Sequence, residues 1–168
     1  MNAVIYLDRD GTLIEDTGHP YRIDEYRRLP GAAEGLERLQ SAGYRLAIVT
    51  NQSGIARGLY DEAAFWRFQE QLVRDFAAKG VRFEATYFCP HLPDAGCACR
   101  KPRPGMLQRA LREMAADPDR SWMVGDRPSD VQAGLAAGLR VLQLGSDLPD
   151  LRAVADRILA DGRAPQTR

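Results

Sequence analysis

Five short apolar runs alternate with longer helical patterns along this chain, and that alternation limits the folds open to it. The runs span residues 3–7, 45–49, 85–88, 121–124 and 140–144. Each run shows little polar alternation, which is typical of strands buried on both faces, as in a parallel sheet. The helical patterns between the runs would supply the crossover connections that a parallel sheet needs.

Four helical patterns separate these runs. The first covers 32–42 and the second 61–79, each stops at a glycine, and Asp61 is placed to cap the second. The third begins at Pro104, a favoured first helical position, and the fourth covers 130–137. Strands and helices together predict an α/β fold: a doubly wound, Rossmann-like parallel sheet with right-handed crossovers.

The composition is that of an ordinary globular protein. The chain has 168 residues, 45% hydrophobic and 27% charged, and we predict one domain over 1–161 with a loose tail over 162–168. Its formal net charge is +0, which argues against a broad surface for nucleic acid or membrane. No apolar run approaches the ~18 residues that span a bilayer, and no signal-like segment precedes the first strand. We therefore expect a cytoplasmic protein. We also expect it to be a monomer, although no sequence pattern reports on the oligomeric state.

Polar clusters follow the first, second and fourth predicted strands. The first strand ends in Asp8 and Asp10, the second runs into Thr-Asn-Gln-Ser at 50–53, and the fourth runs into Asp126 with Asp130 close behind. Ligands of open α/β sheets bind beyond the carboxyl ends of the strands. The sequence therefore predicts a binding site along that edge of the sheet.

Asp8 and Asp10 carry the most informative part of this pattern. If the chain turns at Arg9, both carboxylates can converge above the end of the strand. Neighbouring carboxylates repel, so they need a cation between them or a proton on one of them. Asp-Arg-Asp-Gly is also a common turn composition, and a solvated turn is the alternative interpretation.

All three cysteines of the chain lie between positions 89 and 99, together with one of its two histidines. Cys89, His91, Cys97 and Cys99 match the ligand set of a tetrahedral zinc site, and four protein ligands make such a site structural. Zinc would clamp this Pro/Gly-rich loop and fix the residues at its exit. The alternative is a group of unrelated buried cysteines beside a surface histidine.

Four ordered motifs resemble those of the haloacid dehalogenase (HAD) superfamily: Asp8-x-Asp10-Gly-Thr12, hydrophobic-Thr50-Asn51, Lys101-Pro102 and Gly125-Asp126-x-x-x-Asp130. They leave no large insertion for a cap domain, so the likeness implies a capless HAD-like fold that acts on phosphate esters. Within that branch, T-N-Q-S-G-I-A-R-G and C-P-H-L-P-D-A-G-C-A-C-R-K-P are similar to the D-glycero-D-manno-heptose 1,7-bisphosphate 7-phosphatases.

The resemblance implies a catalytic Mg²⁺ held by Asp8, Asp126 and the backbone carbonyl of Asp10. Asp8 would attack phosphorus and form an aspartyl-phosphate. Asp10 would protonate the leaving alkoxide and then deprotonate the hydrolytic water. Thr50 and Lys101 would hold the phosphoryl oxygens.

Outside these catalytic groups, Asp130 would orient Lys101 or a metal-bound water. The resemblance also implies a set of substrate contacts on the same edge of the sheet. These contacts are Asp16, Thr17, Gly18, His19, Thr50, Asn51, Gln52, Ser53, Arg100, Lys101 and Arg127. Arg100 is the natural candidate for a second phosphate, because a guanidinium can bind phosphate with two hydrogen bonds. Asp16 and His19 have the alternative of loop solvation and capping.

The activity implied is removal of the C7 phosphate from heptose 1,7-bisphosphate in the synthesis of ADP- or GDP-heptose, a precursor of lipopolysaccharide core or S-layer glycans. The short Cys/His loop resembles that of histidinol-phosphate phosphatases, which are the alternative among enzymes. A catalytically idle, zinc-stabilised HAD binding module is the alternative outside enzymes, and no motif residue is missing to support it.

Overall fold

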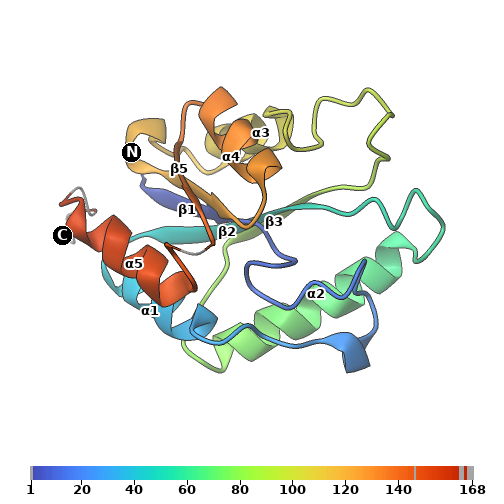
Figure 1. Cartoon of the computed structure of the whole chain (residues 1–168), viewed down its shortest axis with the longest axis horizontal. Coiled ribbons are helices and arrows are strands. Elements are labelled where there is room, and N and C mark those ends of the chain that lie inside the picture. The colour runs from blue at the N-terminus through green and yellow to red at the C-terminus, as the bar shows by residue number, and fades with distance from the viewer. Residues whose placement is uncertain (1, 146, 163–164, 166–168) are drawn as a thin grey trace.

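A five-stranded parallel sheet forms the centre of the computed structural model, which describes residues 2–145, 147–162 and 165. The strand order is β3-β2-β1-β4-β5 (Figure 1). The strands are β1 (Val4–Leu7), β2 (Arg45–Asn51), β3 (Ala85–Cys89), β4 (Trp122–Gly125) and β5 (Arg140–Gln143). All four pairings between neighbouring strands are parallel, which confirms the predicted doubly wound sheet.

Helices cover both faces of the sheet (Figure 1). One face carries α1 (Ala32–Ser41), α2 (Glu62–Ala77) and α5 (Leu151–Ala160), and the other carries α3 (Gly105–Glu113) and α4 (Pro128–Ala136). Two short 3₁₀ helices, η1 (Ile23–Glu25) and η2 (Pro118–Arg120), lie in the connections. Among the described residues no insertion forms a separate cap.

The central strand β1 shows why the sequence folds in this way. Its four residues are fully buried, and alternate side chains enter different cores. Ile5 and Leu7 pack with the residues of α1, α2 and α5, whereas Val4 and Tyr6 pack with those of α3 and α4. A strand buried on both faces has no polar alternation, as the apolar run predicts.

Several element boundaries differ from the sequence-based expectation. The strand pairing of β2 with β3 continues to Asn51, beyond the expected end at residue 49. Pro104 caps α3 instead of opening it, and α4 begins earlier than expected, at Pro128. Asp61 caps α2 as predicted, since its side chain accepts from the backbone N–H of Ala64 at 2.7 Å.

The edge strand β5 is only half-buried, and Gln143 at its end is exposed, so the expectation of a buried strand was wrong there. The fifth helix, α5, lies beyond the predicted helical patterns and packs on α1. The expected loose tail at 162–168 falls mostly outside the described residues. No helix in the described part of the chain is long and apolar enough to cross a membrane.

The order of the strands fixes where a ligand can bind. From β1 the chain moves outward to β2 and β3, and then returns to place β4 on the other side of β1. This reversal opens a crevice at the carboxyl ends of β1 and β4. Asp8 follows β1 and Asp126 follows β4, so both residues lie beside that crevice.

Candidate active site

A polar cavity of about 300 Å³ lies at the carboxyl ends of the strands. Its walls contain four carboxylates, four cationic side chains, one histidine and several small, mostly polar residues. The lining residues are Asp8, Asp10, Asp16, Gly18, His19, Thr50, Asn51, Ser53, Arg57, Arg100, Lys101, Arg127, Ser129 and Asp130. The four HAD-like motifs therefore meet in one place, although they are up to about 120 residues apart in the chain.

Lys101 lies at the base of the cavity between two carboxylates. Its Nζ is 2.7 Å from Oδ1 of Asp8, 2.6 Å from Oδ1 of Asp130 and 2.8 Å from the carbonyl oxygen of Val49. Burial alone would lower the pKa of Lys101, but the charges of Asp8 and Asp130 raise it above its ordinary value. The ammonium is therefore charged, and it compensates two buried carboxylates.

Asn51 places the backbone of Lys101. The Asn51 amide accepts from the Lys101 N–H at 3.1 Å and donates to the Lys101 carbonyl at 3.0 Å. Both ends of one side chain thus fix one peptide segment, so the end of β2 determines where the Lys101 ammonium lies. The resemblance places Asn51 among the substrate contacts, and the structure gives its amide these two partners inside the protein.

Asp126 approaches the first motif closely. A Cβ atom on Gly11 would lie 2.3 Å from Oδ2 of Asp126, so only glycine permits this approach. Burial, with the charges of Asp8 and Asp130, raises the pKa of Asp126 to about 6. One oxygen each of Asp8, Asp126 and Asp130 lies within 4.8 Å of the others, which is a geometry that can hold a small cation.

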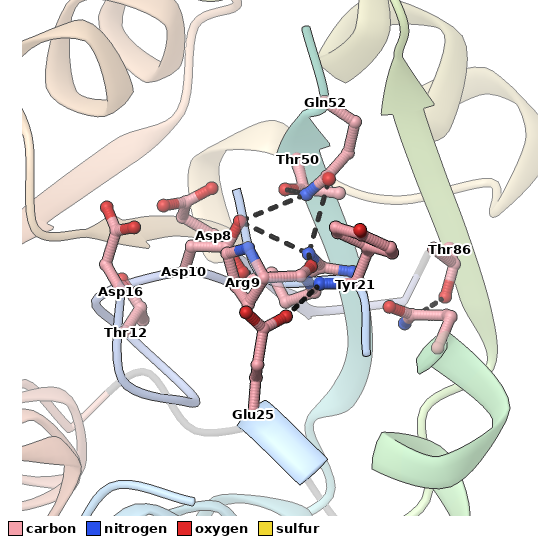
Figure 2. Close-up of polar contacts among 12 residues, drawn as sticks. Asp8, Arg9, Asp10, Thr12, Asp16, Tyr21, Glu25, Thr50, Gln52 and Thr86 are labelled. Atoms are coloured by element: carbon pink, nitrogen blue, oxygen red, sulfur yellow. Dashed lines mark hydrogen bonds and ion pairs between the residues drawn. The ribbon is translucent and has the colours of Figure 1, made fainter. Parts of the chain in front are cut away.

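Asp10 points toward β2 and is held by two polar side chains (Figure 2). Arg9 Nε lies 2.7 Å from Asp10 Oδ1, and Gln52 Nε2 lies 3.2 Å from Asp10 Oδ2. Burial raises the pKa of Asp10, and the charge of Arg9 opposes that rise. A carboxyl group with a raised pKa is suited to donate a proton near neutral pH.

The loop after the first motif forms one wall of the cavity. Asp16 pairs with Arg127 at 2.6 Å, which joins this loop to the start of α4. Asp16, Gly18 and His19 line the cavity, whereas Thr17 is exposed and lies outside the lining. Of the other predicted substrate contacts, only Gln52 lies outside it, because its buried side chain faces Arg9.

Two residues that line the cavity, Arg57 and Ser129, are not among the site residues predicted from the sequence. Arg57 donates to Ser53 Oγ at 3.4 Å and extends the cationic wall formed by Arg100 and Arg127. The position of Arg57 four residues after Ser53, inside T-N-Q-S-G-I-A-R-G, is the sequence feature that could have identified it.

The predicted zinc ligands gather at the end of β3. Cys89 Sγ lies 3.4 Å from His91 Nδ1, 3.7 Å from Cys97 Sγ and 3.1 Å from Cys99 Sγ. All four ligand atoms lie within 4.8 Å of one another. Burial opposes ionisation of Cys97, but the backbone N–H of Arg100 and the neighbouring thiols lower its pKa to about 6. The group can hold a metal ion through thiolate and imidazole.

Comparisons with known proteins agree with this geometry. The model of the HAD-hydrolase-like family matches residues 98–161. The chain is 42% identical over 146 residues to a D-glycero-beta-D-manno-heptose-1,7-bisphosphate 7-phosphatase of Pasteurella multocida, covering 83% of this chain and 79% of the relative. It is 39% identical over 166 residues to the Escherichia coli K12 protein of the same name, covering 92% and 87%.

Solved structures give the same result. A D,D-heptose 1,7-bisphosphate phosphatase from B. bronchiseptica, complexed with magnesium and phosphate, superposes with a TM-score of 0.83 at 34% identity, covering 95% of this chain and 99% of that one. The phosphatase of that name from Burkholderia thailandensis gives a TM-score of 0.68 at 30% identity, with the same coverages. The chain belongs to the family of the D-glycero-beta-D-manno-heptose-1,7-bisphosphate 7-phosphatases, within the HAD-like hydrolases.

Proposed function

We propose that this protein is a Mg²⁺-dependent phosphatase that removes the C7 phosphate of D-glycero-D-manno-heptose 1,7-bisphosphate. The observation that carries the proposal is the convergence of Asp8, Asp10, Thr50 and Lys101 on one cavity. The relatives at 39–42% identity, which are named for this activity, support the choice of substrate. We further propose that the protein acts as a cytoplasmic monomer on a small sugar phosphate.

The residues around Asp8 fit a magnesium ion. Asp8 and Asp126 are the proposed carboxylate ligands, because they offer hard oxygen atoms within 4.8 Å of each other. Asp130 is 1% exposed and pairs with Lys101 at 2.6 Å, so we assign it to holding Lys101. The backbone carbonyl of Asp10 is the third proposed protein ligand. When bound, Mg²⁺ would neutralise charge on the phosphate and on the attacking carboxylate, which otherwise repel each other.

Asp8 is the proposed nucleophile. One of its oxygens accepts from Lys101, which leaves the other free to attack phosphorus and form an aspartyl-phosphate. Lys101 then lies beside the phosphoryl group as a positive charge, and the Thr50 hydroxyl is a second donor for its oxygens. Asp130 keeps Lys101 in place throughout the reaction, since the two groups form a buried pair.

Asp10 is the proposed general acid and base. It lies two residues beyond the nucleophile, lines the same cavity and pairs with Arg9 at 2.7 Å. Its proton would go to the departing sugar alkoxide, which is a poor leaving group without protonation. The same carboxylate would then remove a proton from the water that hydrolyses the aspartyl-phosphate.

Zinc at Cys89, His91, Cys97 and Cys99 is proposed as a structural ion, because all four positions around it come from the protein. The loop that it would fix leads directly into Arg100. The guanidinium of Arg100 donates to the His91 carbonyl at 3.3 Å and lines the cavity. We propose that Arg100 receives the C1 phosphate that is not transferred.

Phosphate release from a panel of phosphate esters tests this function. With Mg²⁺ present, heptose 1,7-bisphosphate is expected to give the highest kcat/KM, and histidinol phosphate serves as the substrate of the alternative enzyme. Removal of Mg²⁺ by chelation is expected to abolish release from every ester. Preference for histidinol phosphate would contradict the substrate assignment, and no release from any ester would contradict the enzyme assignment.

A further inference from the structure

A buried arginine separates the two aspartates of the first motif. Arg9 has no exposed surface, and its Nε and Nη2 lie 2.7 and 3.3 Å from the two oxygens of Asp10. The guanidinium lies over the rings of Phe65 and Phe68, at 5.5 and 4.9 Å from their centroids. Aromatic rings on α2 thus hold the cation in one plane, and both oxygens of Asp10 have a fixed partner.

Gln52 lies beside Arg9 and contacts the same carboxylate (Figure 2). Its Nε2 donates to Asp10 Oδ2 at 3.2 Å and to Thr50 Oγ1 at 2.9 Å. Its Oε1 accepts from Arg9 Nη2 at 3.2 Å and from the Tyr60 hydroxyl. An amide offers two donor and two acceptor positions, so every hydrogen-bonding position of Gln52 is taken inside the protein.

These partners allow the Gln52 amide only one orientation. Arg9 can only donate and an ionised Asp10 can only accept. A rotated amide would therefore place its NH₂ group against the Arg9 donor and its oxygen against the Asp10 acceptor. Gln52 is 1% exposed and does not line the cavity. Contact between this side chain and a sugar would require breaking buried hydrogen bonds, which is costly.

The network also reaches the loops around the cavity. Arg9 Nη2 donates to the carbonyl of Pro20 at 3.1 Å, directly after the loop at 16–19. The ring of Tyr60 stacks on that of Tyr21 at a centroid distance of 5.0 Å. Asp10 is therefore connected through Arg9 and Gln52 to β2 and to the loop at 16–19, which forms one wall of the cavity.

We propose that Arg9, Gln52 and Tyr60 are positioning residues that hold the carboxyl group of Asp10 in the orientation needed for proton transfer to the leaving group. Gln52 has this role in place of a contact with the sugar. The inference rests on the proposed function only in that Asp10 acts as the general acid. Small errors in the placement of a catalytic group cost large factors in rate, so a side chain that touches no substrate can control this step.

Gln52→Met tests the proposal, because methionine has a similar length and makes none of the four hydrogen bonds. Gln69→Met is the matched control: Gln69 is also 1% exposed, lies on α2 and donates to Thr86 Oγ1, away from Asp10. Single-turnover formation of the aspartyl-phosphate is measured by rapid quench for two esters. A hexose 6-phosphate needs a proton on its leaving group, whereas p-nitrophenyl phosphate does not.

Gln52→Met is expected to slow phosphorylation by the hexose phosphate about tenfold to a hundredfold, with a much smaller loss for p-nitrophenyl phosphate. Its KM for the hexose phosphate should stay within about twofold of the wild-type value, and Gln69→Met should leave the ratio of the two rates unchanged. Equal losses on both esters, or a raised KM with an unchanged ratio, would overturn the proposal.

Two further experiments, on a second variant and on the structures of the variants, also test the proposal. If Gln52→Met does not fold, Tyr60→Phe removes a single hydroxyl from the network and must shift the same ratio in the same direction. A crystal structure of either variant is expected to show the Asp10 carboxyl in more than one orientation, and an unchanged orientation would overturn the proposal. The crystal structure tests the proposed role of Gln52 even if the wild-type protein cleaves none of the esters. A lack of cleavage would contradict the proposed function itself.

Discussion

At the base of the cavity, two carboxylates share one ammonium group. Lys101 lies between Asp8 and Asp130, and Asp126 adds a third carboxylate to the same cluster. The cluster therefore carries an excess of negative charge, which a divalent cation would balance. The same geometry explains how each of these residues responds to substitution.

Asp8→Asn is expected to lower turnover by about a thousandfold or more, because an amide is a poor nucleophile and a poor ligand for Mg²⁺. The fold should persist, since the substitution keeps the shape of the side chain and leaves Lys101 paired with Asp130. Steady-state phosphate release and thermal unfolding measure the two effects. Near-wild-type turnover in a folded variant would refute the nucleophile assignment.

Asp126 makes stability and metal binding depend on pH. Its pKa rises from 3.8 to about 6 on folding, so without metal the folded state binds this proton more tightly than the unfolded chain. The stability that this proton contributes is present below the unfolded pKa and is lost as the pH rises through about 6. Mg²⁺ binding needs the ionised carboxylate, so the affinity should increase over the same range.

Thermal unfolding of the metal-free protein across this pH range tests the predicted fall in stability, and Mg²⁺ titration tests the predicted rise in affinity. Asp126→Asn is the control, because its amide cannot titrate. The variant should show a flatter pH dependence of the melting temperature than the wild type and should bind Mg²⁺ weakly at every pH. An unchanged pH dependence in the variant would assign the effect to other groups.

Arg100→Ala is expected to lower kcat/KM for heptose 1,7-bisphosphate by about tenfold to a hundredfold and to spare heptose 7-phosphate, which has no second phosphate. Arg103→Ala is the matched control, because Arg103 lies in the same segment and contacts the Cys97 carbonyl but does not line the cavity. Steady-state kinetics on both esters provide the comparison. Equal losses on the two esters would place Arg100 at the transferred phosphate.

Sequence motifs identify the residues that carry the chemistry, but they do not show which way the neighbouring side chains point. Asp8, Asp10 and Lys101 come from recognisable motifs, and the structure places them on one cavity. Gln52 belongs to the same kind of motif, yet it turns inward because a buried Arg9 and Tyr60 offer it partners. That arrangement depends on α2, which is distant in sequence from Arg9.

At the scale of elements, the Cys/His loop and its exit form one unit. The loop connects β3 to Arg100 and Lys101, and its own apolar packing is limited to the half-buried Cys97 and Cys99 beside the core of α3 and α4. A loop with so little buried surface would take its shape from the proposed zinc ion. Metal binding and substrate binding should therefore be coupled through Arg100.

Cys97→Ser is expected to weaken zinc retention and to raise the KM for phosphate esters together, while most of the sheet stays folded. Atomic absorption gives the zinc content, and circular dichroism reports on the sheet. Ser53→Ala is a control that changes the cavity without touching the thiols. Unchanged substrate affinity in a verified zinc-free protein would refute the coupling.

Elements are predictable from the sequence where burial is uniform. The central strands β1, β2 and β4 are buried on both faces and appear as plain apolar runs. The edge strand β5 has Arg140 and Gln143 at its two ends and is only half-buried, since an edge strand has one neighbour. The helix α5 follows this edge and owes its place to packing on α1, a contact that a local pattern does not contain.

For the whole molecule, the order of strands brings the chemistry together. The reversal between β1 and β4 is what makes motifs at opposite ends of the chain converge on one crevice. Helices on both faces leave the carboxyl edge of the sheet as the place where loops can meet, and no cap among the described residues closes it (Figure 1). The open crevice suits a small, highly charged sugar phosphate.

We expect this protein to remove the C7 phosphate of heptose 1,7-bisphosphate and to leave the C1 phosphate in place. Phosphorus NMR of the reaction with Mg²⁺ follows both phosphates of one substrate at once, and the Asp8→Asn protein serves as the control. The predicted result is loss of the C7 phosphomonoester signal, growth of inorganic phosphate and retention of the C1 signal, with no change in the control. Loss of the C1 signal, or a substrate that persists intact with folded, Mg²⁺-loaded wild-type protein, would contradict the proposed activity.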